Sequence, residues 1–430
     1  MEFKKITVGN FAENLDRFRV PLSSAEREKK QGTYPYYGAA KIIDYVDGFT
    51  HSGLSVLIAE DGSVETDKGY PVVQLANGEY WVNNHTHVLK GKDDWDTLYL
   101  YYALQIIKVS PFVTGAVQKK ISQKALNSME LNYFEDPMIR RKIVESLLGL
   151  DQKIQLNTQI NQTLEQIAHT IFKSWFIDFD PVHAKANALA NGQTAEQASQ
   201  AAMAVISGKN TQELHRLQTA NPEQYQQLWE IAEAFPSGFD EEGVPRGWES
   251  KPLDEIAIYQ NGLALQKFRP ESEDEYLPVV KIAQLKQGYA DGKEKASVNI
   301  KPECIIDNGD VIFSWSGSLV VDIWCGGKAA LNQHLFKVTS KNYPKWLYYF
   351  YTVHHLAEFQ RIAADKAVTM GHIKREHLSL ALCVIPNNKF IQKFCFLEDY
   401  ISQIVNNRLQ NVSLIKIRDE LLPKLLSGEI

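Results

Sequence analysis

The sequence predicts an α+β protein in which two similar globular α/β blocks are separated by two long antiparallel helices that form an intramolecular coiled coil. Three observations lead to this prediction. The chain has 430 residues, which exceeds the size of a typical single core. Its second half repeats its first half, and each half ends in a long run with helical periodicity. The fold therefore has a pseudo-twofold internal repeat.

The internal repeat is clearest where residues 82–104 align with residues 331–353 without gaps, at an offset of 249. His85 falls on His334 in this alignment. Two further pairs of segments keep the same order: residues 56–63 with 311–318, and residues 8–12 with 253–257. The offset drifts along the chain, as small loop insertions would make it. Each half is therefore predicted to follow the same structural plan.

Each half opens with a block of mixed local signals. Short apolar runs such as "SVLIA", "VVQLA" and "DVIFSW" are typical of strands, and Gly, Asn and Asp separate them. The predicted segments are a first block at 1–135, a central long helix at 136–180, an acidic helical insertion and linker at 181–245, a second block at 246–385, and a C-terminal long helix at 386–430.

The two helical runs carry apolar residues at spacings of three and four, which predicts one seam along each helix. Each run spans roughly 40 residues, or about 60 Å of α-helix, and needs a partner for its stripe. The equivalent helix of the other half is the expected partner. The predicted seam residues are Leu147, Ile154, Asn157, Asn161, Leu164, Ile171 and Trp175 in the first helix, and Leu397, Ile404, Asn407, Asn411, Leu414, Leu421 and Leu425 in the second.

Asparagines occupy the same two positions in both seams, Asn157 with Asn161 and Asn407 with Asn411. A polar pair inside a seam lowers stability but fixes register and partner. The alternative is that these side chains face water where the seam widens.

The stretch "IFKSWFIDFDPVHAKA" at 171–186 has two interpretations. Asp178, Asp180 and His183 could hold a metal ion, but the second half has no equivalent residues. The other interpretation is the end of the first helix, with Pro181 ending it because proline cannot continue the hydrogen-bond ladder. We favour the helix end and predict no metal site.

Composition narrows the functional classes. The net charge is −6, and most of it lies in residues 181–245, which carry three basic and eight acidic side chains. The two blocks are therefore near neutral, and a nucleic-acid surface on either block must be local. No apolar run approaches the length of a membrane span, and "MEFKKITVGN" lacks the apolar stretch of a secretory signal. The four cysteines form no C-x-x-C pair. We expect reduced thiols, a cytoplasmic location and no membrane partner.

Motifs of enzymes are missing from the sequence. There is no P-loop, no G-x-G-x-x-G after a strand, no H-E-x-x-H and no G-x-S-x-G. We therefore predict no catalytic residue, no metal and no cofactor in this chain.

Several quoted segments together resemble one family. "VPLSSAEREK", "YPYYGAAKIIDYV", "AEDGS", "WVNNHTHVLKG", "GAVQKKIS" and "SWFIDFDPVHAKA" are similar to the specificity subunits of type I restriction–modification enzymes. The most specific part is "FKSWFIDFDPVHAK" followed by "AFPSGF" and "VPRGW", which mark the central junction of that family. The segment between these motifs is longer than the family pattern suggests.

The resemblance implies two target-recognition domains, each reading one half of a split site in double-stranded DNA, with the helices acting as a ruler. It implies a subunit without catalysis of its own. The implied partners are two DNA adenine methyltransferase subunits, which use S-adenosylmethionine, and two restriction subunits, which translocate and cut DNA using ATP and Mg²⁺.

Base readout requires amide and cationic side chains in loops, with further cations on phosphates. The candidate DNA-binding residues in the first block are Arg17, Arg19, Lys29, Lys30, Lys41, Asn84, Lys119 and Lys120. Those in the second block are Lys267, Arg269, Lys281, Gln284, Lys328, Gln333, Lys366, His372 and Lys374. Asn83, His85, Asn332 and His334 are shared by both halves and cannot distinguish two half-sites, so we expect a structural role or a phosphate contact for them.

Two other functional classes remain open from the sequence. A coiled-coil adaptor without DNA recognition would retain no DNA even with methyltransferase subunits present. A free-standing DNA-modifying enzyme would need a cofactor motif that the sequence does not show. An adjacent adenine methyltransferase gene would favour the specificity subunit.

Overall fold

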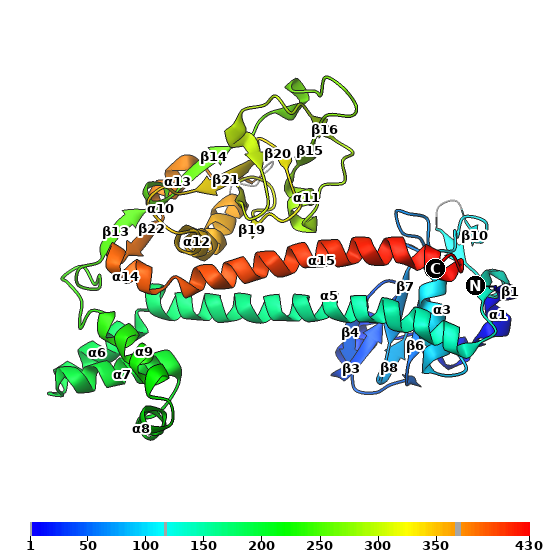
Figure 1. Ribbon diagram of the computed structural model, residues 1–430, viewed down its shortest axis with the longest axis horizontal. Coiled ribbons are helices and arrows are strands. Elements are labelled where there is room, and N and C mark those ends of the chain that lie inside the picture. The colour runs from blue at the N-terminus through cyan, green and yellow to red at the C-terminus, as the bar shows by residue number, and fades with distance from the viewer. Residues whose placement is uncertain (1, 116–117, 366–370) are drawn as a thin grey trace. The chain divides into compact units, whose positions relative to one another are not determined.

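The computed structural model describes residues 2–115, 118–365 and 371–430. The chain divides into two compact units. Unit 1 comprises Met1–Leu156 with Asn411–Ile430, and unit 2 comprises Asn157–Gln410. Two long helices, α5 and α15, each continue from one unit into the other, and both are labelled in Figure 1.

The block in unit 1 contains two four-stranded sheets, with strand orders β2-β9-β6-β7 and β4-β3-β8-β5, and a two-stranded sheet of β1 and β12. Strand β6 is buried along its whole length, as its unbroken apolar sequence predicts. The strands are β1 Lys4–Thr7, β2 Glu13–Asn14, β3 Gln31–Tyr37, β4 Ile42–Val46, β5 His51–Ser52, β6 Ser55–Ala59, β7 Val73–Ala76, β8 Glu79–Val82, β9 Thr86–Lys90, β10 Val113–Thr114, β11 Lys120–Ile121 and β12 Glu130–Tyr133.

The block in unit 2 repeats the topology of these three sheets; among the described residues, the pair of β10 and β11 in unit 1 has no counterpart. Its sheets have the orders β14-β21-β18-β19 and β16-β15-β20-β17, and β13 pairs with β22. The parallel pair β3 and β8 corresponds to the parallel pair β15 and β20. The predicted internal repeat is confirmed. The strands are β13 Glu249–Pro252, β14 Ile258–Asn261, β15 Leu277–Val280, β16 Lys295–Ala296, β17 Ile305–Ile306, β18 Val311–Ser314, β19 Val321–Ile323, β20 Ala329–Leu331, β21 Leu335–Thr339 and β22 Leu382–Ile385.

The core of each block lies between its first four-stranded sheet and one helix, α3 in unit 1 and α12 in unit 2. Tyr99 and Tyr102 of α3 are buried there, as are their repeat equivalents Tyr348 and Tyr351 of α12. The helices of the blocks are α1 Val8–Phe11, η1 Asp16–Phe18, α2 Ser24–Glu28, α3 Asp94–Leu104, α4 Gln123–Ser128, α10 Leu253–Ile256, η3 Leu265–Lys267, α11 Ile282–Gln287, η4 Pro302–Cys304, α12 Lys345–Asp365, α13 Arg375–Leu380 and α14 Asn388–Lys393.

The long helices are α5, Pro137–Phe172, and α15, Phe396–Leu426. Within each unit the two helices lie side by side (Figure 1) and run antiparallel, because partners with rising numbers in α5 have falling numbers in α15. Every predicted seam residue is buried or half-buried.

The asparagines form hydrogen bonds between α5 and α15. In unit 2, Asn161 Nδ2 donates to the carbonyl of Ile404 at 3.1 Å, and Asn407 Nδ2 donates to Asn161 Oδ1 at 2.8 Å. In unit 1, Asn411 Nδ2 donates to the carbonyl of Ile154 at 3.2 Å. Asn161 with Ile404 and Asn411 with Ile154 are repeat equivalents, so the same bond is made once in each unit. Asn161 and Asn407 are buried and do not face water.

The end of the first long helix differs from the prediction. Residues Lys173–Ile177 form a π-helical turn, and Phe179 adopts a left-handed conformation with φ 53°. Pro181 does not end this helix; it lies in the first turn of α6, Asp180–Ala190, where a missing N–H has no cost. The prediction that Pro181 is the terminator was therefore wrong.

Four helices follow the first long helix: α6, α7 Ala195–Ser207, α8 Thr211–Ala220 and α9 Pro222–Ala234. Helices α7, α8 and α9 share a small apolar core around Met203 and Leu214. Lys185 of α6 is buried, and its ammonium donates to the carbonyls of Ala232 at 3.2 Å and Phe235 at 2.7 Å. It thereby caps the carboxyl end of α9. None of the described helices combines the length and the apolar character that a membrane crossing requires.

We predict that Asn161→Leu lowers the free energy of unfolding of unit 2 by about 1–3 kcal/mol, because the buried amide of Asn407 loses its acceptor. The double variant Asn161→Leu/Asn407→Leu should recover most of this loss, since both polar partners are then removed. Urea unfolding measures both values. Gln162→Leu, at an exposed position of α5, is the control. A double variant less stable than the single one would contradict the prediction.

Candidate nucleic-acid interface

Three chain segments meet at the surface of each block. In unit 1 they are residues 60–63 after β6, residues 83–85 between β8 and β9, and residues 119–122 before α4, which we call the first platform. In unit 2 they are residues 315–318, 332–334 and 371–374, which we call the second platform. The two sets are equivalent in strand topology.

Equivalent backbone hydrogen bonds hold the three segments of each platform together. The first platform has the bonds Glu60 N to His85 O at 2.9 Å, Gly62 N to Lys119 O at 3.0 Å and Ile121 N to Glu60 O at 2.8 Å. The second has Trp315 N to His334 O at 3.3 Å, Gly317 N to Gly371 O at 2.8 Å and Ile373 N to Trp315 O at 3.0 Å. Gly62 and Gly317 both have positive φ, a conformation that favours glycine. The backbone of the two platforms is therefore the same.

The residues shared by both halves build this backbone. Asn83 Oδ1 accepts from the backbone N–H of His85 at 2.9 Å, and Asn332 Oδ1 accepts from that of His334 at 3.2 Å. Both asparagines are buried. Each asparagine therefore closes a turn, and the structure gives the pair a structural role.

The side chains of the two platforms differ in charge. In the first, Asp61 lies 2.8 Å from His85 Nδ1, and Lys120 lies 3.0 Å from Glu60. In the second, the position equivalent to Asp61 is Ser316, whose hydroxyl lies 2.9 Å from His334 Nδ1. One backbone thus presents Asp61 and Lys120 in the first block and Ser316 and His372 at the equivalent positions in the second, where Lys374 is the platform's cation.

A buried ionic network lies beneath the first platform. His87 Nδ1 is 2.6 Å from Asp16, and its Nε2 is 2.8 Å from the carbonyl of Ile121. Arg19 binds Glu60 at 2.6 Å and Asp16 at 3.4 Å. The ligand atoms of Asp16, Glu60 and His87 are close enough together to hold a metal. Arg19 and Lys120 already neutralise the carboxylates, however, and both ring nitrogens of His87 are engaged.

This network sets the protonation of its acids. Burial raises the pKa of Asp16, but the hydrogen bonds from His87 and Val88 lower it further than burial raises it. The pKa of Asp16 therefore lies below its ordinary value, and the same holds for Glu60 beside Arg19 and Lys120. Sequence reasoning missed Asp16, Glu60 and His87, because their partners are distant in the chain and no local pattern marks them.

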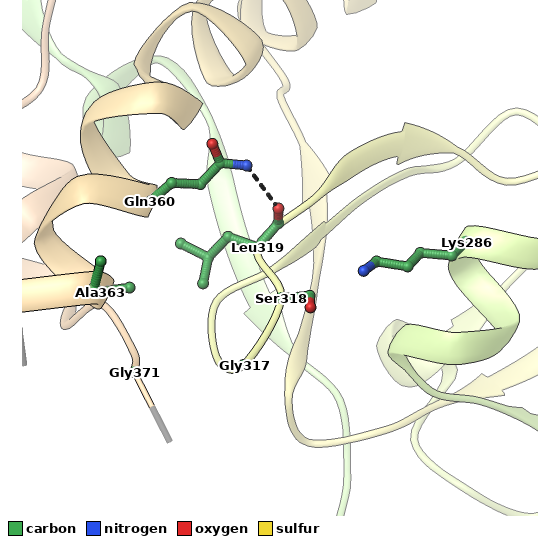
Figure 2. A pocket seen from close by; sticks show the side chains of 8 residues that line it. Lys286, Gly317, Ser318, Leu319, Gln360, Ala363 and Gly371 are labelled. Carbon is green, nitrogen blue, oxygen red and sulfur yellow. Dashed lines mark hydrogen bonds between the residues drawn. The ribbon is translucent and has the colours of Figure 1, made fainter. Parts of the chain in front are cut away.

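A pocket of about 410 Å³ adjoins the second platform (Figure 2). Gly317 and Ser318 line one side of it, and Gln360 of α12 donates to the carbonyl of Leu319 at 3.1 Å. The side chain of Lys286, from α11, points toward Ser318. A cation, a hydroxyl and small residues suit a phosphate group. Lys286 was not among the sequence candidates, although it lies in α11 two residues after the candidate Gln284.

The platforms gather six of the candidate residues: Asn84, Lys119, Lys120, Gln333, His372 and Lys374. The other exposed candidates, on loops and helices outside the platforms, are Arg17, Lys29, Lys41, Lys267, Arg269 and Lys328. Arg19, Lys30, Lys281 and Gln284 are half-buried, and ion pairs engage the first three. Lys366 lies outside the described residues.

Arginines of α15 tie each block to the helices of its own unit. In unit 2, Arg408 binds Asp322 of β19 at 2.8 Å and Glu165 of α5 at 3.1 Å. In unit 1, Arg418 binds Asp151 of α5 at 2.9 Å, and the hydroxyl of Tyr102 donates to the same carboxylate at 2.7 Å. Both contacts fix a block against the helix pair.

Comparison with known proteins connects this architecture with one family. Residues 2–166 and 245–413 match the family described as the type I restriction modification DNA specificity domain. The chain is 32% identical to the type I restriction enzyme HindI specificity subunit of Haemophilus influenzae, over 72% of this chain and 71% of that protein. It is 24% identical to the MjaIX specificity subunit of Methanocaldococcus jannaschii, over 87% and 79%.

A solved structure shows the same fold. The S subunit of a type I restriction–modification system from M. genitalium superposes with a TM-score of 0.54 at 13% sequence identity, covering 99% of this chain and 96% of that one. The four helices α6 to α9 fall outside the two ranges that match the family.

We predict that Asp16→Asn destabilises unit 1 by about 1–3 kcal/mol at neutral pH, because the buried His87 loses the carboxylate that lies 2.6 Å from its Nδ1. Arg19 keeps its ion pair with Glu60. Folding lowers the pKa of Asp16 below its ordinary value of 3.8. Asp16 therefore stabilises the fold fully above pH 3.8, and this stabilisation is lost as the pH falls through the lowered pKa. The difference between variant and wild type should therefore shrink toward pH 3.

Hydrogen exchange of the β9 amides at pH 7, and thermal unfolding at pH 7 and pH 3, measure this effect. Asp67→Asn, at an exposed position in the same unit, is the control. A difference of equal size at both pH values would show that the charge of Asp16 does not carry the effect.

Proposed function

The chain belongs to the DNA specificity subunits of type I restriction–modification enzymes, and we propose that each of its two blocks reads one part of a bipartite, asymmetric DNA site. Specificity subunits are not themselves catalytic, so the chain serves the enzyme complex by selecting its site. We assign the first recognition domain to residues 1–135 and the second to residues 246–385.

The observation that carries this proposal is the pair of platforms. They share a backbone, but Asp61 and Lys120 of the first platform are replaced by Ser316 and His372 at the equivalent positions of the second. Sequence is read in DNA by the pattern of donors and acceptors that a protein presents to base edges. Two patterns on one backbone suit two different half-sites.

The two long helices would set the distance between the half-sites. Helix α5 has 36 residues, or about 54 Å at ~1.5 Å per residue. Arg408 and Arg418 hold each block against the helices of its own unit, so the orientation of a block follows the helix to which it is bound.

The helices also offer surface for partner subunits. Ile160 and Ile167 of α5 and Val412 and Ile415 of α15 are exposed although apolar. Such residues on a paired helix suit contact with further protein. We propose that two DNA adenine methyltransferase subunits dock there and that two restriction subunits complete a cytoplasmic complex on double-stranded DNA. S-adenosylmethionine, ATP and Mg²⁺ would then be bound by those partners and not by this chain.

Family membership removes the support for a coiled-coil adaptor without DNA recognition. It also removes the support for a free-standing DNA-modifying enzyme. The missing cofactor motif already spoke against the enzyme, and a non-catalytic DNA-reading subunit does not need one.

Exchange of single blocks tests the proposal. We predict that replacing residues 1–135, which include all three segments of the first platform, with the first block of another family member changes one half-site and leaves the other intact, because each platform lies within one unit. The reciprocal exchange of residues 246–385 should change the other half-site. Both chimaeras are assembled with the methyltransferase subunits, and their methylated sites are mapped genome-wide. If either exchange altered both half-sites, the modular account would be wrong.

A further inference from the structure

The middle residues of the two turns at 83–85 and 332–334 are equivalent carboxamides. Asn84 occupies this position in the first platform and Gln333 in the second. Each lies between an asparagine that closes the turn and a histidine that is bonded to the neighbouring loop. The neighbouring positions change from Asp61 to Ser316 and from Lys120 to His372, but the carboxamide is kept.

The backbone of each turn is held in place while the carboxamide is available. The carbonyl of Gln333 accepts from Trp315 Nε1 at 3.2 Å, and its N–H donates to the carbonyl of Leu263 at 2.9 Å. Its side-chain amide is engaged on one side only, where Nε2 lies 3.3 Å from His334 Nε2. Asn84 is exposed, and among the described residues its side-chain amide has no hydrogen-bond partner. A rigid turn with an unused amide is organised for binding before the ligand arrives.

A carboxamide presents one acceptor beside one donor in a plane. In the major groove, adenine offers the complementary pair, its N7 acceptor and its N6 amino donor. Guanine offers two acceptors and is matched by Arg or Lys, and cytosine offers a donor that Glu or Asp accepts. The side chain at these positions therefore selects among bases by its chemistry alone.

We propose that Asn84 and Gln333 each bind the major-groove edge of one adenine, so that both half-sites contain an adenine at equivalent positions. The inference rests on the proposed function, since it requires that the platforms face DNA. The residues around each carboxamide, Asp61 and Lys120 in the first platform and Ser316 and His372 in the second, then distinguish the flanking bases. Asn84 and Gln333 are specificity-determining residues in this account.

The test selects DNA from a randomised pool with the full chain assembled with its methyltransferase subunits. Wild type should recover sequences with adenine at one position of the second half-site. Gln333→Arg should move that preference to guanine, and Gln333→Glu should weaken the preference for adenine by roughly tenfold to a hundredfold. The first half-site should stay unchanged. Asn84→Asp provides the same test in the first half-site with an isosteric change.

The matched control is Gln392→Glu, the same chemical change at an exposed position of α14. It should leave both half-sites as in wild type. Unchanged base preferences in Gln333→Arg, Gln333→Glu and Asn84→Asp would overturn the inference, as would a change spread over both half-sites. A wild-type complex that selected no sequence at all would instead reject the proposed function.

Discussion

The hydrogen bonds between asparagines of α5 and α15 are the constraint on which the remaining architecture depends. A buried amide is costly unless its partners are present, and Asn161 finds Ile404 and Asn407 in one helix register only. A slip of the seam would break these bonds. The bond between Asn411 and Ile154 repeats that between Asn161 and Ile404, so each unit fixes the register with the same contact.

A fixed register matters because both blocks are packed against the helices: Leu147 and Leu422 belong to the core of the first block, and Ala168 and Ile401 belong to that of the second. Arg408 binds both Asp322 of β19 and Glu165 of α5. In unit 1, Tyr102 of α3 donates to Asp151 of α5, which Arg418 of α15 also binds. Within each platform the backbone is held by hydrogen bonds, and Asn83 and Asn332 close the turns at 83–85 and 332–334. Binding specificity can therefore change through surface side chains alone, without changing the scaffold that positions them.

The sequence predicted the features that depend on periodicity and repetition. The seam, with Asn161 and Asn407 among its members, could be found because each long helix carries the spacing by itself. Pro181 was misread, because proline is compatible with the first turn of a following helix and the π-turn before it leaves no local signal. The platforms and the network of Asp16, Glu60 and His87 could not be found, since segments far apart in the chain form them only after the strands have paired.

The claim that the helix pair measures the DNA is tested most directly by lengthening both helices together. Inserting four residues after Thr158 and four after Arg408 leaves Asn157 with Gln410 and Asn161 with Asn407, so every asparagine bond is kept. The pair grows by about 6 Å at ~1.5 Å per residue, while a base-pair step spans about 3.4 Å. Methylated sites mapped genome-wide should show unchanged half-sites separated by one or two additional base pairs. An unchanged spacer with unchanged half-sites would show that the helices hold the subunits together but do not measure the DNA.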